Sequence, residues 1–229
     1  MSQYLAKSAL LPDGWANDVL IGVDEDGWIK SVQSGQRHAQ AQILDGAVLP
    51  GMPNLHSHAF QRAMAGLAEY TDGAQNSFWT WRKVMYDFLA KLGPEEIEKI
   101  ATNLYTDMLK AGYTQVGEFH YLHHQPNGTP YDDQTELSHC MIRAAKTAGI
   151  AITLLPVLYA KGGFGGKAPE DGQKRFINTP DQILDMVSSL HQEYSGDPQV
   201  NIGLAFHSLR AVTPPSTPAH VTGAGEPPA

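Results

Sequence analysis

The chain has 229 residues, of which 42% are hydrophobic and 17% charged, and its formal net charge is -8. This composition is that of a globular protein long enough to bury a core, and without a cluster of lysines and arginines it argues against a nucleic-acid partner. The single cysteine, Cys140, excludes an intrachain disulfide. No apolar run approaches the roughly 20 residues that span a membrane, and no signal-peptide pattern opens the chain, so we expect a cytoplasmic protein.

Residues 1–46 predict a small unit of short β-strands. The first strand, 4–11, stops at the turn signal Pro-Asp-Gly. Two further apolar runs, 19–23 and 28–32, flank a segment that ends in Asp-Gly, which is typical of a β-hairpin. We do not expect this unit to fold as a domain by itself.

From Ala47 onward, predicted strands and helices alternate. Strands are expected at 47–56, 114–121, 150–159 and 200–207, and helices at 78–92, 94–111, 135–148 and 180–194. Apolar strands alternating with helices favour an α/β fold with a parallel sheet and helices outside it. Either a doubly wound sheet or a (β/α)8 TIM barrel would satisfy this pattern. The doubly wound sheet is disfavoured because no glycine-rich phosphate turn follows the first strand.

Polar side chains stand at the end of each predicted strand of this alternating region. His56 and His58 end the first strand, residues 118–121 the second, Tyr159 the third and residues 207–210 the fourth. In a barrel these ends gather at the C-terminal face, where active sites are built.

His56 and His58 are one residue apart, so on a strand both rings point to the same face. Two neutral imidazoles can share a metal ion, and the alternative is a polar surface pair. Two histidines suit zinc, iron or nickel equally. Arg210 can either grip a carboxylate in bidentate fashion or pair with an acidic neighbour.

The remaining histidines and the cysteine carry weaker signals. One of His120, His123 and His124 could face the site, but we expect His123 and His124 to be solvated loop residues. Cys140 is expected to be a small buried residue on a helix, without a nucleophilic role.

Four motifs, HSHAFQRAMAGLAE, SFWTWR, GYTQVGEFHYLHH and GLAFHSLRAV, resemble the formimidoylglutamate deiminase family of the amidohydrolase superfamily. The resemblance extends from Tyr4 to Thr213. It implies a (β/α)8 barrel and the hydrolysis of N-formimino-L-glutamate to N-formyl-L-glutamate and ammonia, a step of histidine degradation. It also implies a single zinc ion that activates water.

The resemblance also implies roles for particular residues. His56 and His58 would be metal ligands, and Arg210 would hold a carboxylate of the substrate with a hydroxyl donor beside it. The positions that match the family's substrate site are Gln61, Tyr121, His207 and Arg210.

The family pattern continues beyond the residues present here. It places a third metal histidine and the general acid/base residues on the fifth and sixth strands and a metal aspartate on the eighth, so we expect no catalytic residue in this chain. Residues 47–212 would be the first four βα units of the barrel. Residues 1–46 would be part of a composite β-sandwich, and residues 213–229, rich in proline, would be disordered.

These expectations leave several interpretations open. The chain alone should bind zinc poorly and turn over little substrate. It could instead belong to another amidohydrolase, of the guanine or cytosine deaminase or chlorohydrolase type, or it could be a non-catalytic half-barrel with a binding role. The partner is expected to be a small molecule, and a homodimer remains an open alternative.

Overall fold

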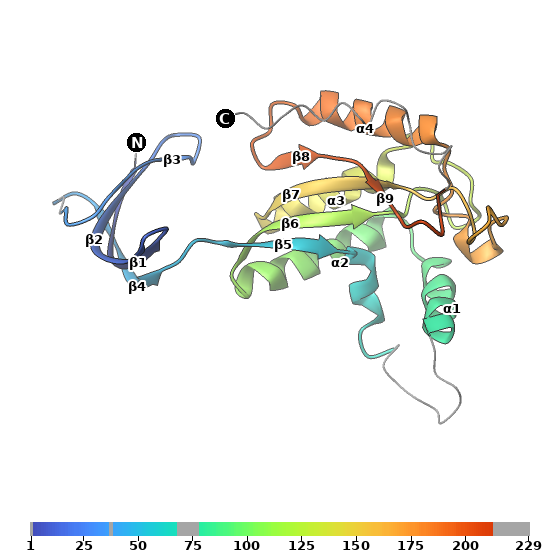
Figure 1. Cartoon of the computed structure of the whole chain (residues 1–229), viewed down its shortest axis with the longest axis horizontal. Coiled ribbons are helices and arrows are strands. Elements are labelled where there is room, and N and C mark those ends of the chain that lie inside the picture. Colours follow the sequence, from blue (N-terminus) through green and yellow to red (C-terminus); the bar gives the residue numbers. More distant parts are fainter. Residues whose placement is uncertain (1, 37–38, 68–77, 213–229) are drawn as a thin grey trace. The chain divides into compact units, whose positions relative to one another are not determined.

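The structure is a computed structural model that describes residues 2–36, 39–67 and 78–212 (Figure 1). The chain divides into two compact units, Met1–Gly51 and Met52–Ala229, which we describe separately. The predicted disorder of residues 213–229 lies outside the described residues. No helix among the described residues is long and apolar enough to cross a membrane.

The first unit is a four-stranded sheet with the strand order β3-β2-β1-β4. Strand β1 (Ser2–Leu11) pairs antiparallel with β2 (Gly14–Val23), which pairs antiparallel with β3 (Ile29–Gln33), as the Asp-Gly signal predicts. Strand β4 (Gln42–Val48) then runs parallel to β1.

The predicted strand 47–56 is wrong in its boundaries. Ala47 and Val48 end β4, where they pair with β1 of the first unit, and the next strand, β5, spans Met52–Ser57. Pro50 lies between the two strands and has no backbone N–H to donate to a ladder. A continuous apolar run therefore contains the junction between the two units.

The second unit contains a parallel sheet, which confirms the predicted α/β class. Strand β5 is followed by β6 (Tyr113–His120), β7 (Ala151–Leu158) and β8 (Val200–Ile202), and these four pair in this order. The predicted strand 200–207 is broken, because β8 ends at Ile202 and a two-residue strand, β9 (Ala205–Phe206), pairs separately with the end of β7. At the break, the Gly203 N–H donates to the Leu154 carbonyl, and a Cβ on Gly203 would lie 2.6 Å from Leu155 Cδ2.

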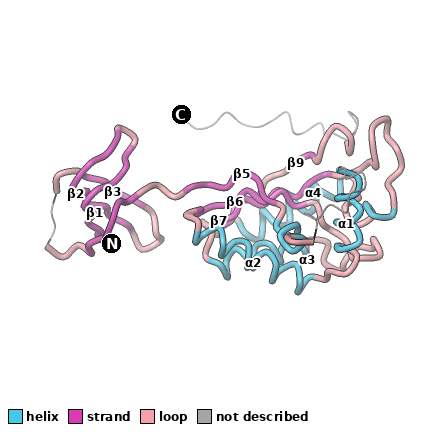
Figure 2. Tube along the Cα trace, turned by 90° about the horizontal axis from the view of Figure 1, so that it is seen from below, coloured by secondary structure: helices cyan, strands magenta, loops and turns pink. Residues whose placement is uncertain are grey.

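Four α-helices belong to the described part of this unit: α1 (Phe78–Leu89), α2 (Pro94–Lys110), α3 (Glu136–Ala148) and α4 (Pro180–Tyr194). Figure 2 shows α2 and α3 on one face of the sheet. The core lies between this face and the helices, where Val116, Ile152 and Leu154 of the strands join one cluster with Ile97 and Met141 of the helices. Cys140 is buried on α3, as predicted.

Short 3₁₀ segments complete the unit at the end where the strands finish. One, η1 (Ala59–Met64), directly follows β5, and the other, η2 (Asp171–Gln173), lies between β7 and α4. The parallel strands thus deliver their carboxyl ends, together with these segments and α1, to one region of the unit.

Candidate active site

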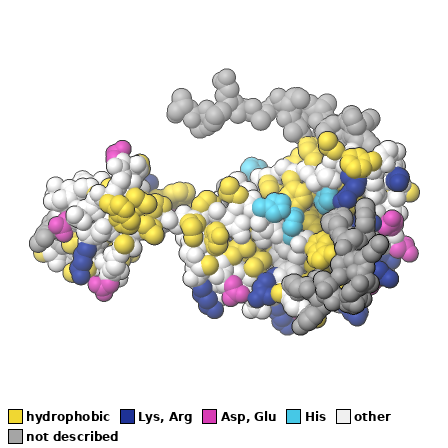
Figure 3. All heavy atoms as spheres, turned by 60° about the horizontal axis from the view of Figure 1, so that its bottom comes forward, with side chains coloured by type: hydrophobic (Ala, Val, Ile, Leu, Met, Phe, Trp, Pro, Cys, Tyr) yellow, Lys and Arg dark blue, Asp and Glu magenta, His cyan; other side chains and the backbone are white. Residues whose placement is uncertain are grey.

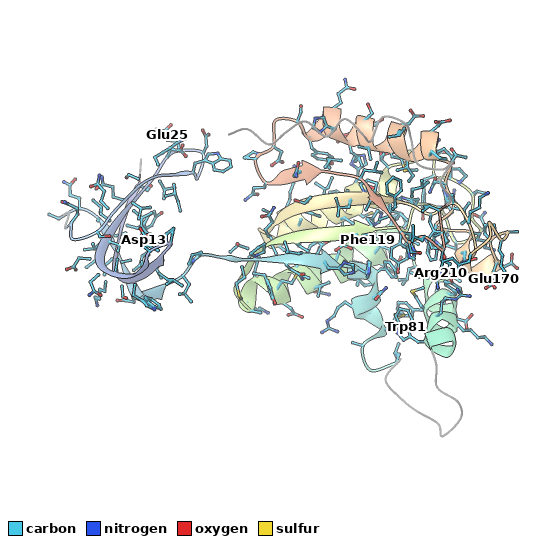
Figure 4. All side chains as sticks on the ribbon, viewed as in Figure 1. Asp13, Glu25, Trp81, Phe119, Glu170 and Arg210 are labelled. Carbon is cyan, nitrogen blue, oxygen red and sulfur yellow. The ribbon has the colours of Figure 1, made fainter. Side chains whose placement is uncertain are left out.

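A cavity of about 340 Å³ lies at the carboxyl ends of the parallel strands. It brings together five of the six residues singled out in the sequence, from three separate segments: His58 and Gln61, then Tyr121, then His207 and Arg210. Figure 4 shows Phe119, Trp81 and Arg210 at this end of the larger unit, and Figure 3 shows histidine side chains gathered on the surface of the same unit.

The sixth residue, His56, contacts His58 directly. The two Nε2 atoms are 3.0 Å apart, so both rings do point to the same side of the chain. The His58 Nδ1 lies 3.0 Å from the Phe119 carbonyl oxygen. Because a carbonyl only accepts, Nδ1 of His58 carries the proton, and its Nε2 keeps a lone pair that faces His56. Burial lowers the pKa of His58, which favours this neutral form.

The histidine pair can supply two of the ligands of a divalent metal ion. Neutral imidazole nitrogens bind zinc at about 2.0–2.1 Å, so two of them 3.0 Å apart can share one ion. The hydrogen bond to the Phe119 carbonyl supplies the outer-shell support that fixes the orientation of a ligating histidine. Within the described residues, however, no group of three histidine, cysteine or acidic side chains could hold a metal.

A buried carboxylate holds the backbone behind the histidine pair. Glu118 on β6 is 1% exposed and accepts the Ala59 N–H at 2.7 Å and the Tyr105 hydroxyl at 3.0 Å. Burial raises the pKa of Glu118, and these donors oppose that effect. Since Ala59 directly follows His58, the carboxylate anchors the turn that presents the ring. The sequence placed Glu118 at the strand end but suggested no role for it.

The substrate-site residues predicted from the resemblance form a contiguous cluster. The Gln61 amide donates to the Tyr121 hydroxyl at 2.9 Å. The ring of Tyr121 contacts those of His58 and His207, with centroids 5.2 and 5.3 Å apart. Burial, with smaller contributions from Arg210 and His58, lowers the pKa of His207 to about 4, so this imidazole is neutral at pH 7.

Helix α1 supplies a wall that the sequence reasoning missed. Trp81, Arg82, Met85 and Tyr86 all line the cavity, and the Arg82 guanidinium lies 3.0 Å from a carboxylate oxygen of Glu170. Burial, reinforced by Tyr159, raises the pKa of Tyr86 to about 12. The i, i+1, i+4 and i+5 spacing of these four positions indicates a shared helix face but not the cavity that this face lines.

The expectation that His123 and His124 are solvated is wrong. They are 1% and 4% exposed, and each Nε2 bonds a backbone carbonyl, at 3.2 Å to Val157 and 2.8 Å to Ile177. His120 is also buried, and none of the three lines the cavity. Backbone carbonyls from other segments accept hydrogen bonds from the rings of His123 and His124, so these two adjacent polar residues enter the core.

Comparisons with known proteins identify relatives of this chain. Residues 1–42 match the family model for the N-terminal domain of formimidoylglutamate deiminase HutF. A formimidoylglutamate deiminase from Pseudomonas aeruginosa is 53% identical over 216 residues, which are 93% of this chain and 47% of that protein. The chain therefore spans about half the length of the curated relative that it matches, and the resemblance to the N-terminal half of this family is confirmed.

Solved structures support the same relationship. An amidohydrolase from Brucella melitensis superposes with a TM-score of 0.88 at 47% identity, over 94% of this chain and 48% of that one. An atrazine chlorohydrolase from Arthrobacter aurescens, solved in complex with zinc, superposes with a TM-score of 0.71 at 18% identity over the same shares of the two chains. At that identity the second likeness concerns the fold alone.

Proposed function

We propose that this chain forms the N-terminal half of a zinc-dependent hydrolase that deiminates N-formimino-L-glutamate to N-formyl-L-glutamate and ammonia. In this proposal the parallel sheet is the first four βα units of a (β/α)8 barrel. One observation carries the proposal: a single cavity is lined both by His58, whose ring contacts His56 in a pair suited to a metal, and by groups suited to carboxylates. The 53% identity with a formimidoylglutamate deiminase supports it.

The carboxylate end of the cavity matches a dianionic ligand. Arg82 and Arg210 both line the cavity, and guanidinium groups bind carboxylates through paired, charge-assisted hydrogen bonds. Tyr121 adds a hydroxyl whose pKa is raised, chiefly by burial, so it remains a protonated donor at neutral pH. N-formimino-L-glutamate carries two carboxylates. Arg82 also pairs with Glu170, so Arg210 is the main discriminator. A neutral purine or pyrimidine base would not need this guanidinium, which disfavours the guanine and cytosine deaminase alternatives.

The histidine end of the cavity would receive the formimino group. His56 and His58 would hold zinc, which when bound supplies a Lewis acid that activates water at neutral pH. His58 contributes a lone pair fixed in place by its bond to the Phe119 carbonyl, and Glu118 anchors the backbone behind it. His207, neutral at pH 7, can form a hydrogen bond to the ligand without adding charge.

Ligand binding to the 229-residue chain tests this proposal, because described residues of this chain line the cavity. Isothermal titration calorimetry would compare N-formyl-L-glutamate with guanine. We expect N-formyl-L-glutamate to bind. The R210M substitution should lower the affinity about tenfold or more, because it removes a charge-assisted contact. R62M is the matched control, since Arg62 pairs with Asp107 and lies outside this cavity. Binding of guanine alone, or an R210M variant with unchanged affinity, would refute the assignment.

A further inference from the structure

Tyr159 and Gln173 form a buried pair beside the cavity for which the relationships above provide no role. Tyr159 follows β7, is 2% exposed and lines the cavity, whereas Gln173 ends η2, is fully buried and lies behind the wall. The Gln173 Nε2 donates to the Tyr159 hydroxyl oxygen at 2.7 Å. The phenol ring packs against His207, with centroids 4.4 Å apart.

The other bonds of Gln173 determine which way its amide faces. Its Oε1 accepts the backbone N–H of Glu170 at 2.8 Å, which places the NH₂ group on the side of Tyr159. The second N–H of that group lies 3.3 Å from the Gly162 carbonyl oxygen. Every polar atom of the amide thus has a partner, and a flip of the amide would set Oε1 against the carbonyl of Gly162.

This orientation gives the Tyr159 hydroxyl a defined polarity. Because its oxygen already accepts a hydrogen bond from Gln173, the hydroxyl proton is the group left to bond elsewhere. Tyr121 repeats the arrangement, since its oxygen accepts from the Gln61 amide at 2.9 Å. A glutamine thus orients each of two phenols in one cavity wall. The proton of Tyr159 is left for another acceptor, whereas the Tyr121 hydroxyl lies 3.8 Å from the sulfur of Met85, a weak acceptor.

We propose that Tyr159, oriented by Gln173, is a second phenol that donates to a ligand carboxylate and selects carboxylates over carboxamides. A carboxylate oxygen only accepts, so it suits a donor of fixed polarity, whereas an amide NH₂ in the same place would face a proton. The inference rests on the proposed function for the presence of a carboxylate ligand. It adds Tyr159 as a specificity-determining residue and Gln173 as a positioning residue.

Three ligands test the pair by calorimetry on the 229-residue chain: glutarate, its half-amide glutaramate, and butyrate. We expect Y159F to weaken glutarate about tenfold, as the loss of one charge-assisted hydrogen bond does. The dissociation constant of glutaramate should change less. The ratio of the glutaramate constant to the glutarate constant should therefore fall toward one. A purely structural role would weaken both ligands alike and leave this ratio unchanged. The matched control is Y113F, because Tyr113 begins β6, at the end of the strand away from the cavity.

Variants of Gln173 test the polarity itself. In Q173E the new carboxylate would accept the Tyr159 proton and turn the phenol into an acceptor, so the preference for glutarate should be lost. If Q173E does not fold, as judged by circular dichroism, Q173M serves instead, because it frees the hydroxyl to rotate and should lower the preference without adding charge.

The outcomes separate this inference from the proposed function. If glutarate binds and Y159F keeps the wild-type ratio, the inference is overturned and the proposed function stands. If butyrate binds as tightly as glutarate and Y159F weakens both, the phenol donor stands and the dicarboxylate function is overturned. If the wild-type chain binds none of the three ligands, both are overturned.

Discussion

The fully buried histidine His123 should make the larger unit unstable in mild acid. Burial, with a smaller contribution from His124, lowers its pKa to about 4, against an ordinary value near 6.5. Between these pH values the unfolded chain binds a proton that the folded chain excludes. The free energy of unfolding therefore falls as the pH falls through this window.

The size of the effect follows from the two pKa values. At 1.36 kcal/mol for each pH unit, a pKa near 4 in the folded chain corresponds to roughly 3 kcal/mol once the window is crossed. About 2 kcal/mol of this should be lost already at pH 5. That is a large share of the ~5–15 kcal/mol by which domains are usually stable.

Replacing His123 with glutamine tests this reasoning. The glutamine side chain does not titrate, and its amide can still donate to the Val157 carbonyl that His123 Nε2 contacts at 3.2 Å. Urea unfolding would be followed at 222 nm, where the described helices, all in the larger unit, dominate the signal. We expect the loss of stability between pH 7 and pH 5 to be about 2 kcal/mol smaller in H123Q. An H123Q variant with the wild-type pH dependence would refute the argument, and H191Q, at an exposed histidine of α4, is the control.

Three further outcomes are expected. The 229-residue chain should retain zinc at well below one equivalent after dialysis, measured by mass spectrometry, because its described residues offer no group of three ligands; one full equivalent would contradict this. R175M should lower the free energy of unfolding by about 3 kcal/mol relative to K174M, because the buried guanidinium donates to carbonyls at the end of α1; equal stabilities would argue against it. G172A should weaken N-formyl-L-glutamate binding in the same calorimetric assay, since the added Cβ would clash with the ring of Tyr86, whereas G196A, in open space, should not.

Several features of this protein could be predicted because they depend on residues close together in the chain. The His-x-His pair converges because alternate residues of a strand share a face. Helix α2 begins at Pro94 with two glutamates in its first turn, and these local signals placed it correctly. The Asp-Gly hairpin between β2 and β3 is of the same kind.

The sequence-based predictions were wrong where contacts with a distant segment determine the local structure. Ala47 and Val48 continue an apolar run into β5, yet they pair with β1, and only that pairing reveals where one unit ends. His123 and His124 have the composition of a loop, but the carbonyls of Val157 and Ile177 bring them into the core. No property of these residues by themselves indicates such partners.

The amino-acid sequence by itself determined the α/β class, the alternation of strands and helices in the larger unit, and which polar residues follow the ends of the parallel strands. It could do so because hydrophobic periodicity and turn chemistry act over a few residues. Only the tertiary structure decided that α1 forms a wall of the cavity and that Gln173 sets the polarity of Tyr159. Those relations depend on hydrogen bonds and packing between segments whose separation in sequence carries no periodic signal.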